Sequence, residues 1–284
     1  HQNTKTAIKW FTLAAEQGDV DAQFNLGNLY SQDENLQDYN VVVKWYSLAA
    51  EQGDVDAQRN LAILYFQDDF VTGTPDYKNA VKWFKRAAEQ GDVDAQFYLG
   101  TIYSKEGDIQ NNKAAVKWYT IAAEQGNIIA QNNLGVMYSQ GDVNGKPDYI
   151  NAVKWFKLAA EEEDVDAQFN LGQMYRRGDG VLQNFNTALY FFGLAANQKL
   201  DSAQNSLGVM YTKGEGVLPD YKIAMKWYKL AAEQGNSGAQ HNLGWLFDIG
   251  GHGIQKDKKI AAKWFKRAAE QGNASAQYNL GLLY

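Results

Sequence analysis

One line of sequence recurs along this chain of 284 residues. The stretch AVKWFKRAAEQGDVDAQFYLG at 80–100 is written eight times with small changes, and its marker Trp83 is 38 residues after the preceding copy and 35 before the next. The counterparts of Trp83 are Trp10, Trp45, Trp118, Trp155, Trp227 and Trp264, with Tyr190 in the remaining place. A period in this range predicts a solenoid with one supersecondary unit per repeat. Its core runs between neighbouring repeats, so its length follows from the number of copies.

Each repeat predicts two helices. The first, DVDAQFNLGNLY (19–30), begins at Asp19 as N-cap and carries an apolar stripe at helical spacing. The second, DYKNAVKWFKRAAEQG (76–91), begins at Asp76 and ends at Gly91, which suits the left-handed position after a helix. The connection to the next helix is short, so we expect the neighbours to pack antiparallel. No stretch alternates apolar and polar residues long enough for a sheet, and the fold class expected is all-α.

A small residue recurs inside the first helix, although glycine there costs about 1 kcal/mol relative to alanine. The position holds Gly27, Gly100, Gly135, Gly172, Gly208, Gly244 and Gly281, with Ala62 in the other copy. Because only glycine and alanine are used, we expect a neighbouring helix to approach too closely for a larger side chain.

The repeats resemble a known family. The positions that match tetratricopeptide-like spacing are Ala7, Phe11, Ala14, Leu26, Gly27 and Tyr30. The Trp before the Phe, the Ala-Ala pair, the longer period and the stretches RRGDGV (176–181) and TKGEGV (212–217) are similar to Sel1-like repeats. The loops SQDENLQDY (31–39) and FQDDFVTGTPDY (66–77) depart from the pattern, so we expect those turns to differ in shape.

This resemblance covers essentially the whole chain and implies an α/α solenoid, a right-handed superhelix of antiparallel helix pairs. It implies one array over 1–284 whose members act as adaptors in protein assemblies. Several bacterial relatives are secreted or cell-surface proteins that meet host factors, and the compartment of this chain is left open between secreted, periplasmic and cell-surface. The expected units are a partial repeat 1–18, repeats 19–53, 54–91, 92–126, 127–163, 164–200, 201–235 and 236–272, and a partial repeat 273–284.

Composition and motifs argue against several classes of function. Net charge is −6, which leaves no basic footprint for nucleic acid, and no apolar run reaches the roughly 18 residues of a membrane span. The chain has no cysteine, no His-Glu-x-x-His pair and no Ser-x-x-Lys motif. Gly145-Lys146 is followed by Pro147 rather than Ser or Thr, which indicates a turn and not a phosphate loop. A metal pair from His241 and His252 is conceivable, but it lacks an acidic partner at ligand spacing. We therefore expect no enzyme, no cofactor and no metal.

Two charge columns run through the repeats. Lysine precedes the marker aromatic at 9, 44, 82, 117, 154, 226 and 263, and glutamate follows near the helix end at 16, 51, 89, 124, 161, 233 and 270. The pairs with i,i+4 spacing are Lys85–Glu89, Lys157–Glu161, Lys229–Glu233 and Lys266–Glu270. We interpret the columns as a solvated outer face with bridges between adjacent repeats, with a ligand-binding ladder as the alternative.

Repeat positions whose residue varies between copies are free of stacking constraints and can face a partner. By the resemblance, the groove positions are two before, two after and five after the marker Leu. Aromatic and arginine residues are the usual interface anchors, and those chosen are Arg59, Phe66, Phe97, Phe169, Arg176, His241 and Trp245. The alternative is that Phe24, Phe97 and Phe169 only pack against the preceding repeat. The recurring Gln and Asn columns either bind a peptide backbone or bridge repeats, and we favour the bridge.

One copy is unusual. In NTALYFFGLAANQKL (186–200) the column Lys is assigned to Leu189, the marker Trp to Tyr190, the Glu to Asn197 and the final Gly to Lys199. Either the packing of this helix differs locally, or its apolar face is a second contact surface on the convex side.

These observations favour a non-enzymatic scaffold that binds a protein or peptide in a superhelical groove. The alternatives are a cell-wall-directed hydrolase or carbohydrate-binding protein, and a passive spacer in a longer signalling protein. The chain opens inside one repeat and stops inside another, which leaves apolar residues such as Trp10 and Tyr284 uncovered. We expect head-to-tail self-association through these ends.

Overall fold

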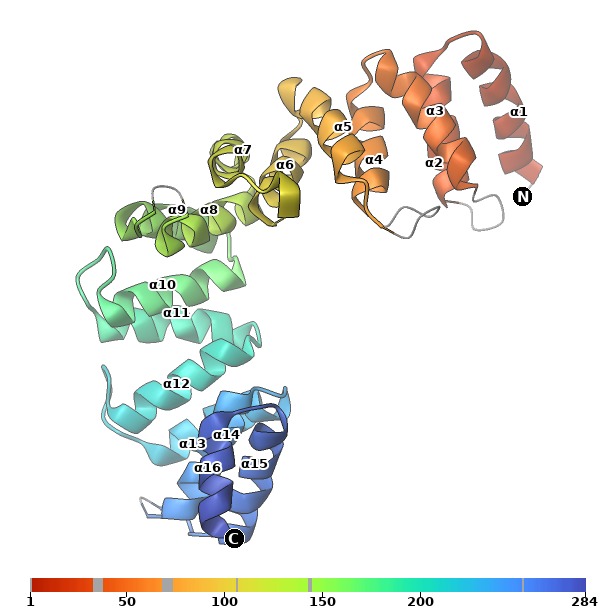
Figure 1. Ribbon diagram of the computed structural model, residues 1–284. Coiled ribbons are helices and arrows are strands. Elements are labelled where there is room, and N and C mark those ends of the chain that lie inside the picture. Colours follow the sequence, from red (N-terminus) through yellow and green to blue (C-terminus); the bar gives the residue numbers. More distant parts are fainter. Residues whose placement is uncertain (1, 33–37, 68–73, 106, 143–144, 252) are drawn as a thin grey trace. The chain divides into compact units, whose positions relative to one another are not determined.

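The computed structural model describes residues 2–32, 38–67, 74–105, 107–142, 145–251 and 253–284 (Figure 1). Within these ranges the chain forms sixteen α-helices, one 3-10 turn and no strand. The α-helices are α1 (Gln2–Glu16), α2 (Val20–Gln32), α3 (Tyr39–Glu51), α4 (Val55–Phe66), α5 (Tyr77–Glu89), α6 (Val93–Lys105), α7 (Asn112–Glu124), α8 (Ile128–Gln140), α9 (Tyr149–Glu161), α10 (Val165–Arg177), α11 (Phe185–Asn197), α12 (Asp201–Lys213), α13 (Tyr221–Glu233), α14 (Ser237–Ile249), α15 (Lys258–Glu270) and α16 (Ala274–Leu283). The 3-10 turn is η1 (Gly107–Ile109).

The helices begin and end where the capping residues predict. Asp19 accepts a hydrogen bond from the backbone N of Ala22 at 2.7 Å, and Asp76 accepts one from Asn79 at 3.0 Å. At the end of α5, Gly91 has φ of +97° and its backbone N–H donates to the carbonyl of Ala88. These bonds satisfy backbone groups that a helix terminus leaves without an intrahelical partner.

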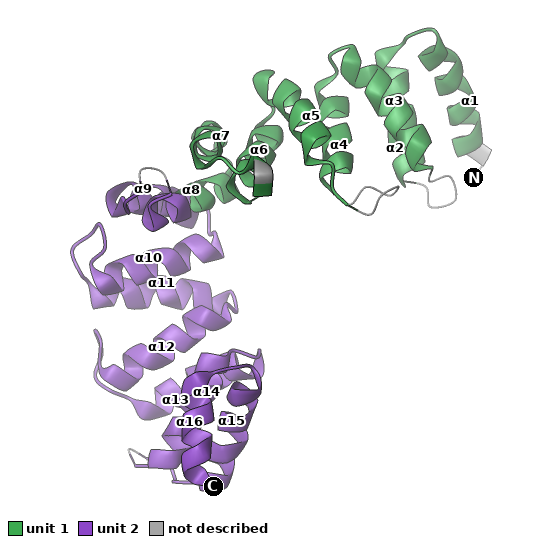
Figure 2. Cartoon of the chain, viewed as in Figure 1, with its two compact units in different colours: residues 1–134 green, residues 135–284 purple. Residues whose placement is uncertain are grey.

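The chain divides into two compact units, residues 1–134 and 135–284 (Figure 2). Inside each unit, helices that follow one another in the chain pack side by side. The all-α class with packed helix pairs of an α/α solenoid is therefore confirmed. The division into a single array with the repeat limits given above stays a prediction. The loops expected to differ, 31–39 and 66–77, include residues 33–37 and 68–73, which lie outside the described ranges.

Marker tryptophans fill the spaces between neighbouring second helices. Trp83 is only 4% exposed and belongs to the main apolar cluster of unit 1, together with Leu61 of its own repeat and Ala50 of the preceding one. Trp45 packs in the same way against Ala15 and its neighbours. Trp118 and Trp155 are also buried, and Trp227 and Trp264 are half-buried.

The recurring glycine faces the aromatic ring that follows the marker Trp. A Cβ placed at Gly27 would lie 2.4 Å from the ring of Tyr46, and one at Gly172 would lie 2.6 Å from Phe192. The same approach is found for Gly100 with Tyr119, Gly135 with Phe156, Gly208 with Tyr228 and Gly244 with Phe265. The expected close neighbour is confirmed for these copies, whereas nothing lies within 4 Å of a Cβ at Gly281.

This contact also sets the register of the unusual copy. Because Phe192 meets Gly172 as Phe156 meets Gly135, the marker column is occupied by Phe191. The assignment of Tyr190 to the Trp column was therefore wrong by one residue.

The corrected register places Tyr190 in the Lys column, which was wrongly assigned to Leu189. Tyr190 is 62% exposed, as a residue of that outer column should be. Leu189 is half-buried and packs against the cluster around Phe192. Local packing therefore accounts for Leu189, and the large apolar side chain that α11 exposes is Tyr190.

Candidate functional site

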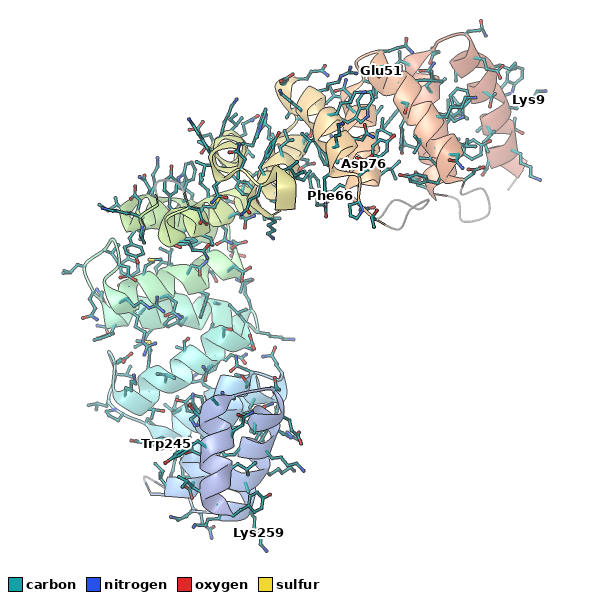
Figure 3. The ribbon with its side chains drawn as sticks, viewed as in Figure 1. Lys9, Glu51, Phe66, Asp76, Trp245 and Lys259 are labelled. Carbon is teal, nitrogen blue, oxygen red and sulfur yellow. The ribbon has the colours of Figure 1, made fainter. Side chains whose placement is uncertain are left out.

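The seven residues predicted to face a partner all lie on first helices of the repeats, and all are half-buried. Unit 1 holds Arg59 and Phe66 on α4 and Phe97 on α6; unit 2 holds Phe169 and Arg176 on α10 and His241 and Trp245 on α14. The structure therefore presents them as two sets, one in each unit. Figure 3 labels one member of each set, Phe66 and Trp245.

Arg59 ties its own repeat to the next one. Its guanidinium forms ion pairs of 2.5 Å with both Asp56 and Asp92. Asp92 also caps the following helix by accepting a bond from the backbone N of Ala95. Burial by itself lowers the pKa of Arg59, but the hydrogen bonds and charges of Asp92 and Asp56 together outweigh it and raise the pKa overall. Arg59 is held in place by these carboxylates, with part of its side chain accessible.

The rings of Phe66 and Phe97 both pack against Tyr98, which was not among the residues predicted to face a partner. The ring centroid of Tyr98 lies 5.5 Å from Phe66 and 5.4 Å from Phe97. Phe97 also lies 6.1 Å from Tyr119 of the following helix. A signal for Tyr98 was present in the sequence, since it interrupts the column that holds Asn in most copies. Unit 1 thus carries a half-buried aromatic cluster on its first helices.

Of the two α10 residues, Phe169 contacts its own repeat and Arg176 contacts the next one. Phe169 packs against Phe192 with ring centroids 5.6 Å apart. Arg176 donates from Nε to Glu215 at 2.6 Å and from a terminal nitrogen to the other oxygen at 3.3 Å. Glu215 lies in the loop TKGEGV (212–217), so Arg176 fastens that loop to α10.

His241 and Trp245 line a cavity of about 590 Å³ together with residues of α16. Tyr278 and Asn279 form the other side of the cavity. The side-chain nitrogen of Asn279 lies 3.0 Å from Nε2 of His241. With the Asn amide as donor, this ring nitrogen is the acceptor. Tyr278 is 68% exposed and presents an open ring beside Trp245.

Tyr278 was absent from the residues selected on the sequence, although it belongs to the same variable column as His241. The cavity combines an indole, a phenol ring, an imidazole and an amide. Such groups bind apolar and aromatic side chains while they pair with polar groups at the rim.

The Gln column bridges neighbouring helices. Gln58 donates to the carbonyl of Ala50 of the preceding repeat at 3.0 Å and accepts from Gln90 of its own repeat at 2.9 Å. Equivalent amide pairs join Gln52 to Gln23, Gln125 to Gln96, Gln198 to Gln168, Gln234 to Gln204 and Gln271 to Gln240. These buried amides are satisfied inside the protein, which supports the interpretation as a bridge.

The charge columns also make contacts between repeats. Glu51 pairs with Arg86 at 2.8 Å and with Lys82 at 3.7 Å, both on the next second helix. The hydrogen bond from Arg86 lowers the pKa of Glu51. Lysines of the column lie over the adjacent marker rings, as Lys82 does over Trp83 at 4.4 Å. Three of the four predicted i,i+4 pairs are present, at 3.8 to 3.9 Å.

The described residues contain no group of three or more His, Asp or Glu side chains placed to hold a metal ion. His252 lies outside the described residues, so the pairing considered for His241 is not tested. Gly145, with φ of +73°, donates to the carbonyl of Gly141 in a turn before Pro147. No helix in the described part of the chain is long and apolar enough to cross a membrane.

Comparison with known proteins agrees with this architecture. The family model described as "Sel1 repeat" matches residues 2–19, 20–54, 55–92, 93–127, 128–164, 165–200, 201–236, 237–273 and 274–284. A crystal structure of a protective antigen present in uropathogenic Escherichia coli strains, which displays an SLR fold, is similar at 38% identity with a TM-score of 0.85. That match covers 97% of this chain and 59% of the antigen, so the chain spans little more than half of that relative.

A Sel1 repeat protein from Oxalobacter formigenes is similar at 33% identity with a TM-score of 0.80. This second match covers 97% of the chain and 79% of the relative. No curated protein sequence matches the chain.

Proposed function

The chain belongs to the Sel1 repeat family, and from that premise we propose that it is a non-enzymatic scaffold that binds a protein or peptide through the first helices of its repeats. Repeats of this kind form scaffolds that commonly serve protein interaction. The observation that carries the proposal is the cavity in which His241 and Trp245 of α14 face Tyr278 of α16.

Binding at this cavity follows from its composition. An apolar or aromatic side chain of the partner enters between Trp245 and Tyr278 and displaces water from both rings. The amide of Asn279 and the imidazole of His241 lie at hydrogen-bond distance from each other, and they orient polar groups of the partner at the rim. Tryptophan and tyrosine are among the residues that most often contribute large shares of binding energy.

The remaining predicted residues extend the proposed surface within each unit. In unit 1 they are Arg59, Phe66 and Phe97, joined by Tyr98. In unit 2, Arg176 is engaged with Glu215, so its truncation also changes the loop 212–217. Trp245 therefore offers the cleaner test.

The test uses a peptide selected from a random library for binding to the intact chain. Trp245→Ala is expected to weaken its binding by more than about 1 kcal/mol while the helical content is unchanged. Leu230→Ala is the control, because Leu230 is an exposed apolar residue on the second helix α13. A peptide whose affinity falls with the control substitution and not with Trp245→Ala would place the binding surface on the second helices.

A further inference from the structure

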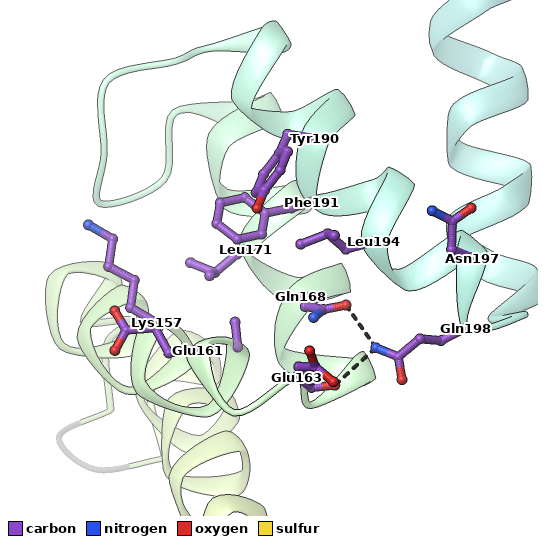
Figure 4. A pocket seen from close by; sticks show the side chains of 11 residues that line it. Lys157, Glu161, Glu163, Gln168, Leu171, Tyr190, Phe191, Leu194, Asn197 and Gln198 are labelled. Carbon is purple, nitrogen blue, oxygen red and sulfur yellow. Dashed lines mark hydrogen bonds between the residues drawn. The ribbon is translucent and has the colours of Figure 1, made fainter.

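A second cavity lies between the second helices α9 and α11 of unit 2 (Figure 4). Its volume is about 790 Å³. Glu161 of α9 lines one side, and Tyr190, Phe191 and Leu194 of α11 line the other. This is the helix in which the repeat pattern is most altered, and the altered positions line the cavity.

The helix pair α3 and α5 shows how a cation occupies this place in one copy, whereas most copies have Leu or Ile where α5 has Arg86. Glu51 at the end of α3 binds the guanidinium of Arg86 on α5 at 2.8 Å. The same guanidinium lies over the ring of Trp83, 4.7 Å from its centroid. Lys82 contributes a second cation to Glu51 at 3.7 Å. An arginine between a carboxylate and an aromatic ring therefore bridges these two helices.

The α9–α11 pair has the same framework. Gln198 donates to Gln168 at 3.0 Å and to the carbonyl of Glu163 at 2.9 Å. In the α3–α5 pair, Gln90 makes the corresponding bonds to Gln58 and to the carbonyl of Gly53. The two pairs can therefore be compared position by position.

In that comparison Glu161 takes the place of Glu51, and the two cations are missing. Leu194 stands where α5 has Arg86, and Tyr190 stands where α5 has Lys82. Glu161 forms no ion pair within 4.0 Å among the residues that the structure describes. The ammonium of Lys157, one turn before Glu161, points away from its carboxylate (Figure 4).

We propose that this cavity binds an arginine side chain of a partner protein, which supplies from outside the guanidinium that Arg86 supplies within the α3–α5 pair. Glu161 accepts two hydrogen bonds from the guanidinium, whose flat face lies against the ring of Phe191, the counterpart of Trp83. The methylene groups of the arginine pack beside Leu194. The net charge of −6 also favours a basic partner.

Arginine fits this place better than lysine. Its planar guanidinium binds a carboxylate in a fixed fork and stacks on aromatic rings, whereas an ammonium is a more strongly hydrated point charge. The surface lies on second helices and is separate from the residues of the function proposed above. It can therefore bind whether or not the first helices do.

The probe is N-acetyl-arginine N-methylamide, titrated into the ¹⁵N-labelled chain and followed by NMR shifts. We expect shifts at the backbone amides of 157–163 and 190–198. The matched citrulline compound, which has the same shape without the charge, should cause none there. Glu161→Gln should lower the affinity about three- to fivefold.

Two variants make the test specific. Leu194→Arg introduces the arginine that α5 carries at this position and should abolish binding, because its own guanidinium then fills the cavity. Glu233→Gln is the control, since in the α13–α15 pair Arg267 already lies over Trp264 at 4.8 Å, and it should leave binding unchanged. Equal binding of the citrulline compound, or unaltered binding by Leu194→Arg, would overturn the proposal. Trp245→Ala should not affect this titration, so the two binding surfaces can fail separately.

Discussion

At the scale of single residues, packing between a glycine and a ring decides which side chains the first helices can carry. Helix propensity alone favours alanine at every one of these positions. The rings of Tyr46, Tyr119 and their counterparts occupy the space that a Cβ would need. The glycine is therefore retained against its propensity, and the copy with Ala62 shows that one helix pair accommodates a methyl group.

The first prediction concerns Gly172. Gly172→Ala should lower the free energy of unfolding by about 1 to 3 kcal/mol, because Phe192 must move and the gain in helix propensity is smaller. Gly281→Ala is the matched control, as its Cβ would meet nothing within 4 Å, and it should be neutral or stabilising. Urea titrations of both variants check this. A Gly172→Ala protein as stable as its parent would show that the ring is not a rigid neighbour.

The second prediction concerns alkaline pH. Burial raises the pKa of Tyr228 to about 12, with the hydroxyl 3.1 Å from that of Thr212. An exposed tyrosine has a pKa of about 10. Because the folded pKa is the higher one, the contribution of Tyr228 to stability is complete below about pH 10 and is lost between about pH 10 and 12. That loss amounts to about 2 to 3 kcal/mol.

Tyr228→Phe should remove this part of the pH dependence. The free energy of unfolding is measured in urea at pH 9 and 11.5 for the parent and the variant, and the parent should lose more. Tyr190→Phe, which changes an exposed hydroxyl, should behave like the parent. The same pH dependence in all three proteins would contradict the assignment to Tyr228.

At the scale of helices, the second helices are followed by a residue with a left-handed backbone, and in two copies this residue is not glycine. Gly18, Gly53, Gly91, Gly126, Gly235 and Gly272 all have positive φ at the residue after the C-cap. Glu163 and Lys199 hold the same position with φ of +62° and +68°. A left-handed conformation costs a residue with a Cβ roughly 1–2 kcal/mol.

The third prediction follows from Lys199. Lys199→Gly should raise the free energy of unfolding by about 0.5 to 1 kcal/mol, since the relief of the left-handed strain exceeds the entropy that glycine adds to the unfolded chain. Gly91→Lys is the reverse change in a regular copy and should destabilise the protein by a similar amount. Thermal unfolding of both variants checks the pair. If Lys199→Gly lowers the stability, the side chain of Lys199 makes a contact that outweighs the strain.

At the scale of the whole molecule, stability is built from contacts between neighbouring repeats. Each described helix packs mainly against the helices before and after it in the chain. The end helices leave large side chains exposed, among them Trp10, Leu282 and Tyr284. Head-to-tail association of the 284-residue chain through these faces stays a prediction, which sedimentation at several concentrations tests.

The fourth prediction concerns how many neighbouring helices are destabilised when one buried side chain is removed. Trp118→Ala removes a buried indole from the main cluster of unit 1 and should cost about 3–5 kcal/mol. Because stability in a repeat array is a sum over neighbours, hydrogen exchange should accelerate first in α5 to α7. Exchange that accelerates equally in α13 to α16 would mean that the array unfolds as one cooperative body.

The sequence by itself determined the local structure of this protein. The cap at Asp76 and the stop at Gly91 act within one or two turns of chain, and the repeated copies make each signal visible. The all-α class and the helix pairs follow from them.

Only the tertiary structure decided which side chains meet across repeats. It moved the marker column from Tyr190 to Phe191, brought Tyr278 to Trp245, and left Glu161 without the arginine that Glu51 has. These contacts join residues 20 or more positions apart, and their distances depend on how helices pack. The repeated pattern predicts the residues that each helix contains, but the space between two helices depends on the side chains of both.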